Sequence, residues 1–302
     1  MKPLQAPKHF IIFCQVIDNF GDIGVCWRLA KQLHRELGQR VTLWVDNLES
    51  LNAICPEINA AQSQQCCAGI EVNHWQAGIE TGNSITHSNT VVIEAFGCNL
   101  PADAIDAIRQ YRCQWLNLEY LALEPWADSV HLASSPVHGC KKTFFVPGFS
   151  PSTGGLLIDE PLRELIATPQ YLARKNLSTL LTSLSFNGLH DLENHYWVSV
   201  FSYPNAPISW LLNALEIGQP TLILVSEGHA LNAFNQALGT TLTAGMQHTI
   251  GAITIVALPL LSQTGFDQVL GACDFNIVRG EESAVRAQLL GKPFLWQLYP
   301  QE

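Results

Sequence analysis

Positive charge is scarce in this sequence. Lysine and arginine together number 16 against 26 aspartates and glutamates, which leaves a formal net charge of −10. Proteins that bind a phosphate backbone need clusters of cationic side chains, so the composition argues against a nucleic-acid partner. No apolar run approaches the roughly 20 residues of a membrane span, and the polar stretch 1–9 does not resemble a secretion signal. We therefore expect a cytoplasmic protein without a membrane partner.

Several motifs of common chemistry are also missing. The nine cysteines include no C-x-x-C pair, and no two histidines lie four residues apart. These spacings are typical of zinc sites and redox pairs, so we expect reduced thiols and no metal. Neither a G-x-S-x-G elbow nor a Walker sequence occurs, which leaves no local support for a serine nucleophile or a P-loop.

What the chain does have is an alternation of apolar strand-like runs and helix-like segments over its 302 residues. Alternation of this kind is typical of βαβ units and parallel sheets. It predicts an α/β protein with doubly wound sheets, divided into a domain 1–150, a connector 151–176 and a domain 177–302. The last strand expected, 294–298, has no covering helix after it, so we expect a further C-terminal segment.

The stretch from Ile17 to Gly24 joins the first predicted strand, 10–17, to the first predicted helix, 23–37. It holds two glycines and two aspartates. Asp18 follows the strand, at the end where open α/β sheets bind their ligands, and Asp22 is a good N-cap for the helix. One interpretation is that these acids carry chemistry. The other is that Asp22 only caps the helix and Asp18 only stabilises the turn.

A second stretch, Arg279 to Ser283, lies between a predicted strand, 275–278, and a predicted helix, 282–290. Backbone N–H groups and the helix dipole favour an anion at such a junction. Arg279 adds a planar fork suited to phosphate, and Ser283 adds a hydroxyl donor. The alternative is a helix start with ordinary acidic residues and an incidental arginine.

Aromatic side chains and one amide also follow strands of the second half. Phe201 and Tyr203 end one strand, and Gln263 and Phe266 follow another. Such residues can stack on and hydrogen-bond a nucleobase. Taken singly, each of them is better explained by a place in the core or at its rim.

Five segments resemble, in order along the chain, the bacterial protein-arginine rhamnosyltransferases of elongation factor P, the EarP family. They are Val16–Gly24, Asn117–Leu121, Phe144–Phe149, Thr153–Leu156 and Arg279–Ser283. The resemblance implies a GT-B glycosyltransferase with two Rossmann-like domains facing a cleft. It implies metal-independent, cofactor-free, inverting transfer of L-rhamnose from the donor dTDP-β-L-rhamnose to an arginine of elongation factor P. That factor rescues ribosomes stalled at consecutive prolines.

By position, the resemblance also implies residue roles. It makes Asp22 the general base, Asp18 its companion acid and Glu281 a second catalytic acid. The implied substrate- and donor-binding residues are Asn19, Phe20, Gly21, Phe201, Tyr203, Leu260, Gln263, Phe266, Arg279, Gly280, Glu282 and Ser283.

Two positions depart from the family pattern. Leu260 stands where an aromatic residue is expected near the thymine, and Glu282 stands where the family usually has aspartate. Two other functions stay open on the residues alone. One is a GT-B transferase with another acceptor, and the other is a non-catalytic protein that binds a nucleotide sugar.

Overall fold

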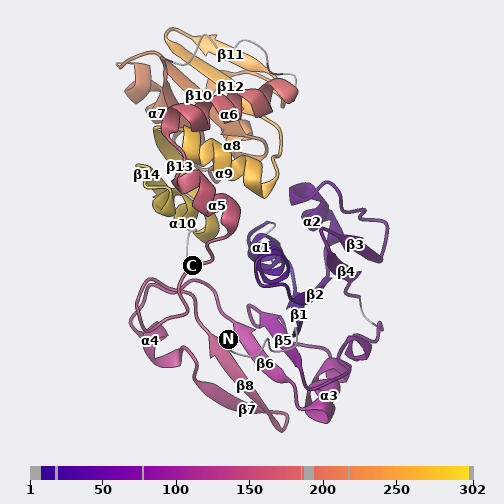
Figure 1. Ribbon diagram of the computed structural model, residues 1–302. Coiled ribbons are helices and arrows are strands. Elements are labelled where there is room, and N and C mark those ends of the chain that lie inside the picture. Colours follow the sequence, from indigo (N-terminus) through magenta and orange to yellow (C-terminus); the bar gives the residue numbers. More distant parts are fainter. Residues whose placement is uncertain are drawn as a thin grey trace. The chain divides into compact units, whose positions relative to one another are not determined.

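The structure is a computed structural model that describes residues 8–17, 20–76, 78–184, 186, 194–216 and 218–298. The chain divides into two compact units, Met1–Glu160 and Pro161–Glu302. In Figure 1 the first unit runs from indigo to magenta and the second continues to yellow. Each unit is an α/β domain built on one twisted sheet.

The first unit contains an eight-stranded sheet in the order β3-β4-β2-β1-β5-β6-β8-β7. All neighbours are parallel except the two edge pairs, β3 with β4 and β7 with β8. Its elements are β1 (His9–Cys14), α1 (Gly21–Arg35), β2 (Arg40–Val45), α2 (Leu48–Ile54), β3 (Gln64–Cys67), β4 (Ile70–His74), the 3-10 turn Gly82–Ser84, β5 (Thr90–Ala95), α3 (Ala102–Tyr111), β6 (Gln114–Leu118), α4 (Trp126–Val130), β7 (Ser134–Val137) and β8 (Cys140–Phe145).

Both faces of this first sheet are buried, as the continuous apolar runs predict. Ile12 and Cys14 of β1 pack with α1 and α2, whereas Ile11 and Phe13 pack on the opposite face with α3. Figure 1 shows α1 and α3 on the two sides of the sheet. Alternate side chains of this one strand therefore belong to two separate hydrophobic cores.

The second unit has a six-stranded sheet in the order β11-β12-β10-β9-β13-β14, parallel except for edge strand β11. Helices α6 and α9 cover one face, and α7 and α8 cover the other. Its elements are α5 (Glu160–Ile166), α6 (Gln170–Ser183), β9 (Tyr196–Val200), α7 (Ile208–Glu216), β10 (Thr221–Ser226), α8 (His229–Leu238), β11 (Gln247–Ile250), β12 (Ile253–Leu258), α9 (Gln263–Ala272), β13 (Phe275–Arg279), α10 (Glu281–Leu289) and β14 (Phe294–Gln297).

The segment expected to be a connector, 151–176, belongs in large part to the second unit. The division falls after residue 160, and α6 lays Ala173, Leu177 and Leu181 into the core that α9 shares. These three residues are spaced to share one face of a helix. Helix α6 is therefore part of the core of the second unit.

Three short edge strands have no counterpart among the elements expected from the sequence. They are β3, β7 and β11, each four residues long and each antiparallel to its neighbour. Their sequences, QQCC, SSPV and QHTI, lack a sustained apolar run because only part of an edge strand is buried. Among the described residues, no helix is both long enough and apolar enough to cross a membrane.

His9 gives the first unit a testable response to pH. Its ring is 4% exposed, and Nε2 lies 2.8 Å from the Thr42 hydroxyl, which itself donates to Glu71. Burial, helped by the nearby Arg40 charge, lowers the pKa of His9 to about 4 from an ordinary 6.5. Between these values the unfolded chain binds a proton that the folded chain does not, so stability falls as pH falls.

Between pH 7 and pH 5, we expect the free energy of unfolding of the native chain to fall by about 2 kcal/mol more than that of the His9→Gln variant. Urea denaturation of both proteins at both pH values measures this difference. Carboxylates shared by the two chains cancel in the comparison. Equal losses would show that His9 titrates normally in the folded chain.

Candidate active site

In the second sheet, the chain leaves the middle strand β9 in both directions, first to β10 and later to β13. The strand ends between β9 and β13 thus form a topological switch point, where doubly wound sheets bind ligands. Phe201 follows β9, and Arg279 is the last residue of β13. The Phe201 N–H continues the pairing by donating to the Ile277 carbonyl at 2.8 Å.

Arg279 is held between two aromatic rings at this switch point. Its guanidinium carbon lies 4.5 Å from the centre of the Phe201 ring and 4.7 Å from that of Tyr203. Contacts of this kind contribute roughly 0.5–2 kcal/mol each. The Nε atom is buried and has no hydrogen-bond partner among the described residues. A stacked guanidinium with an unused buried donor is suited to an anionic ligand.

The aromatic cluster extends to α9. The Phe266 and Phe201 rings meet edge to face, with centres 5.3 Å apart. Gln263, one turn earlier, is 7% exposed, and α9 begins after Ser262, whose hydroxyl accepts from the Gly265 N–H at 3.2 Å. The structure thus brings together Phe201, Tyr203, Phe266 and Arg279, which the sequence predicted as separate donor-site residues. Stacking of a base on these rings stays a prediction.

Helix α10 begins directly after Arg279. Gly280 is its N-cap, with φ of 68° that a side chain would resist, and Ser283 is buried and donates its hydroxyl to the Arg279 carbonyl. Glu281 is the first residue of the helix and is exposed. The N-terminus of α10 therefore lies next to the end of β13, the strand that carries Arg279. The helix dipole favours negative charge at this N-terminus.

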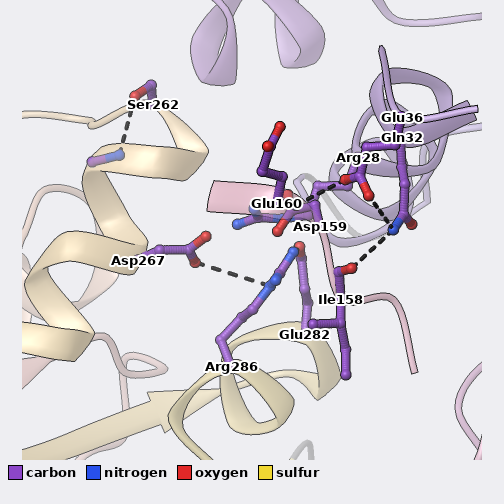
Figure 2. A network of polar contacts seen from close by, with 11 residues as sticks. Arg28, Gln32, Glu36, Ile158, Asp159, Glu160, Ser262, Asp267, Glu282 and Arg286 are labelled. Carbon is purple, nitrogen blue, oxygen red and sulfur yellow. Dashed lines mark hydrogen bonds and ion pairs between the residues drawn. The ribbon is translucent and has the colours of Figure 1, made fainter. Parts of the chain in front are cut away.

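The second glutamate of α10 has a different orientation. Figure 2 shows Glu282 and Asp267 both directed at Arg286, whose Nε lies 3.9 Å from Glu282 and 4.0 Å from Asp267. Arg286 is 2% exposed and Asp267 is 2% exposed. This buried group joins α9 to α10, the two helices that carry Gln263, Phe266 and Ser283. The family is expected to have aspartate at position 282. The longer side chain of Glu282 reaches Arg286.

Leu260 follows β12 and is 41% exposed. Its side chain is large and apolar, and it lies on the loop that leads into α9. Exposed apolar groups at strand ends are available for a ligand to cover. The position expected for an aromatic residue therefore offers an aliphatic surface.

The first sheet has its own switch point. The chain leaves β1 toward β2 on one side and later places β5 on the other. Asp22 lies in the first turn of α1, directly after β1, and is 1% exposed. Its two carboxylate oxygens accept different hydrogen bonds, from the Ile17 N–H at 2.8 Å and from the Tyr120 hydroxyl at 2.9 Å.

The expectation that Asp22 is the N-cap of α1 is wrong. The N-cap is Phe20, which makes no side-chain cap, and Asp22 is one residue inside the helix. Its carboxylate turns back to the strand end because the Ile17 N–H stands there without a strand partner to bond. Phe20 and Gly21 open the helix, whereas Asp18 and Asn19 lie outside the described residues, so their predicted roles stay predictions.

Polar residues at the ends of β5 and β6 surround the same edge. Burial raises the pKa of the Glu119 carboxyl above its ordinary value, although the Asn117 amide donates to it at 2.6 Å. Glu94 is buried and accepts from Lys142 and from the Trp115 indole. No role was predicted for either glutamate, because a single acid within an apolar strand, such as Glu94, or just after one, such as Glu119, gives no spacing signal.

The last residues of the first unit are tied to α1. In Figure 2, Arg28 meets Asp159 at 3.4 Å, and Gln32 donates to the Ile158 carbonyl at 2.8 Å. The Glu160 N–H donates to Glu36 at 2.8 Å. These contacts fix the helix that carries Asp22 to the segment where the first unit ends.

No group of three or more histidine, cysteine, aspartate or glutamate side chains with metal-site geometry occurs among the described residues. The functional groups that the structure does arrange are of two kinds. The second unit offers a stacked cation and a helix N-terminus for an anion. The first unit offers an oriented carboxylate that can take a proton.

Comparison with known proteins shows which family the chain resembles. A family model described as "Elongation-Factor P (EF-P) rhamnosyltransferase EarP" matches residues 10–302. A protein-arginine rhamnosyltransferase of Pseudomonas putida is 41% identical over 302 residues, which cover 96% of this chain and 76% of that protein. One of Shewanella oneidensis is 40% identical over 319 residues, covering 100% and 79%.

Solved structures show the same fold. One that concerns EarP-mediated arginine glycosylation of translation elongation factor EF-P matches with a TM-score of 0.60 and 30% identity, over 97% of this chain and 74% of that one. MurG of Acinetobacter baumannii matches with a TM-score of 0.51 and 14% identity, over 98% and 80%. The fold is thus that of the GT-B glycosyltransferases. From its sequence and its fold together, the chain belongs to the EarP family of elongation factor P rhamnosyltransferases.

Proposed function

We propose that this chain transfers L-rhamnose from dTDP-β-L-rhamnose to an arginine side chain of elongation factor P, with inversion at the anomeric carbon. The observation that carries the donor half is the gathering of Phe201, Tyr203, Phe266 and Arg279 at one switch point. Its neighbour, the N-terminus of α10, adds a place for the diphosphate. Membership of the family supports the acceptor half.

The reaction asks for a base because a guanidinium is cationic at all physiological pH values and has no lone pair ready for attack. We assign this role to Asp22. As a guanidinium nitrogen forms its bond to the anomeric carbon, the carboxylate accepts the N–H proton, and the bond from that carbon to the diphosphate oxygen breaks. One displacement of this kind inverts the anomeric centre.

The departing dTDP carries the charge that must be stabilised. Arg279 and the N-terminal N–H groups of α10 supply a cation and aligned dipoles for it, in the position where another glycosyltransferase could use a metal. Our assignment therefore includes no metal and no other cofactor. Glu281, exposed at the start of α10, is assigned as a second acid that faces the cationic acceptor.

The modified factor is active in rescuing ribosomes stalled at consecutive prolines, and the reaction belongs to the cytoplasm where that factor works. Incubation with dTDP-β-L-rhamnose and elongation factor P, followed by mass spectrometry of the factor, tests the proposal. We expect one added deoxyhexose on an arginine. Donor binding without product would indicate a nucleotide-sugar-binding protein, and product on a different acceptor would replace elongation factor P.

Removal of the proposed base separates chemistry from binding. Asp22→Asn preserves the shape of the side chain but does not accept a proton, so we expect kcat to fall by about 10²- to 10⁴-fold. The dissociation constant for dTDP, measured by calorimetry, stays near that of the native chain. Asp128→Asn, an exposed change on α4, is the matched control. Weakened dTDP binding by Asp22→Asn would assign Asp22 to the donor site instead.

Arg279 is expected to act in the opposite way. Arg279→Lys keeps a positive charge but loses the planar fork and the stacking between the two rings. We expect dTDP to bind about tenfold more weakly, and Arg279→Ala to bind it more weakly still. Lys175→Ala removes an exposed cation from α6 as a control. If calorimetry gives all four chains the same dTDP affinity, Arg279 does not bind the nucleotide.

Leu260 permits a test by gain of affinity. Leu260→Phe places a ring where the family has an aromatic residue, and stacking on the thymine contributes about 0.5–1.5 kcal/mol. We expect dTDP to bind about 3- to 10-fold more tightly, with dTMP showing the same ratio because it carries the same base. Leu295→Phe, an exposed leucine on β14, is the control. An unchanged affinity would place the base away from residue 260.

A further inference from the structure

The Asp22 carboxylate is held by a tyrosine to which the family pattern assigned no role. Tyr120 lies two residues beyond β6, and its hydroxyl donates to Asp22 Oδ1 at 2.9 Å. The other oxygen, Oδ2, accepts from the Ile17 N–H at 2.8 Å. Donors on both oxygens fix the plane of the carboxyl group, which a single donor would leave free to turn.

The Tyr120 ring is itself fixed by Phe96. The two rings are stacked, with centres 4.3 Å apart and planes 16° from parallel. Phe96 follows β5 and has φ of 55°, a left-handed backbone conformation that costs a bulky residue roughly 1–2 kcal/mol. Its N–H donates to the Leu118 carbonyl at 2.7 Å, which extends the pairing of β5 with β6. The strained turn directs the ring under Tyr120.

These three residues come from the ends of different strands. Asp22 follows β1, Phe96 follows β5 and Tyr120 follows β6, so the group lies at the switch point of the first sheet. Asp22 is buried, whereas Tyr120 is 42% exposed. Tyr120 thus links a buried carboxylate to a partly exposed residue at this end of the sheet.

We propose that Tyr120, held by Phe96, is the residue that positions the Asp22 carboxylate for proton transfer. The inference rests on the proposed function, because it requires Asp22 to be the base. Loss of the Tyr120 hydroxyl leaves Oδ1 without this donor and lets the carboxyl group rotate, so fewer molecules hold the base in the orientation that accepts the proton.

The test compares the native chain with Tyr120→Phe, which keeps the ring and removes the hydroxyl. We expect kcat for elongation factor P to fall about tenfold, with KM for dTDP-β-L-rhamnose within a factor of two. A loss confined to kcat, with KM kept, is the result expected of a positioning residue. Tyr171→Phe makes the same chemical change on an exposed tyrosine of α6 and leaves both quantities unchanged.

Phe96→Leu and the double variant Phe96→Leu/Tyr120→Phe complete a cycle. If Phe96 acts by holding the Tyr120 hydroxyl, Phe96→Leu lowers kcat in the native background and has no further effect once the hydroxyl is gone. Additive losses would overturn the pairing. Thermal unfolding of each variant shows whether a loss of kcat only follows a loss of folded protein.

Two failures are distinguishable. If the native chain adds no deoxyhexose to elongation factor P, the proposed function fails and the inference falls with it. If the native chain is active and Tyr120→Phe matches it in kcat, the proposed function stands and Tyr120 has no positioning role. A fall in kcat that comes with a raised KM and matching thermal destabilisation would make Tyr120 a packing residue, which also overturns the inference.

Discussion

Each sheet of this protein has one point where the order of its parallel strands reverses, and this point constrains where a ligand can bind. Parallel strands next to such a reversal send their following loops away to opposite sides, which leaves an opening at their carboxyl ends. In the second unit, that opening lies between β9 and β13 and holds Arg279 with its aromatic partners. In the first, it lies between β1 and β5 and holds Asp22. The assigned chemistry depends on this one topological rule applied twice.

The two sites use burial differently. Arg279 is stacked on rings that leave its charge uncompensated by any carboxylate in the contacts described, so it is electrostatically prepared for an anion. Asp22 is buried, and a hydrogen-bond donor holds each of its carboxylate oxygens in place. In each unit, neutral groups hold the charged side chain: aromatic rings hold Arg279 in the second unit, and a hydroxyl and a backbone N–H hold Asp22 in the first.

The sequence predicted the central elements well because they are apolar on both faces and bounded by turns. Strands β13 and β14 differ by one residue from the expected 275–278 and 294–298, and α10 is shifted by one residue from the expected 282–290. The three antiparallel edge strands were not predicted, since a four-residue polar strand such as β11 depends on its neighbour for pairing. Nothing in the sequence indicated that α6, which begins inside the expected connector 151–176, packs into the core of the second unit, because that packing depends on residues far along the chain.

The site was predictable in its components but not in its contacts. Strand ends and the family pattern identified Phe201, Tyr203 and Arg279, yet nothing in their spacing indicates that two rings enclose one guanidinium. Tyr120 lies 98 residues from Asp22, so only the folded sheet relates them. Asp22 itself was expected to cap its helix, and the tertiary demand of the Ile17 N–H decided otherwise.

The buried arginine between α9 and α10 limits how this fold can change. Arg286 lies close to one acid from each helix, Asp267 and Glu282, and removing either acid would weaken the compensation of a buried charge. The two helices are consequently coupled in position, and drift of one would carry the other with it. Substitutions of single loop side chains can therefore adapt the fold to a different nucleotide base. A gradual shift of α9 or α10 cannot, because each helix holds the other in place.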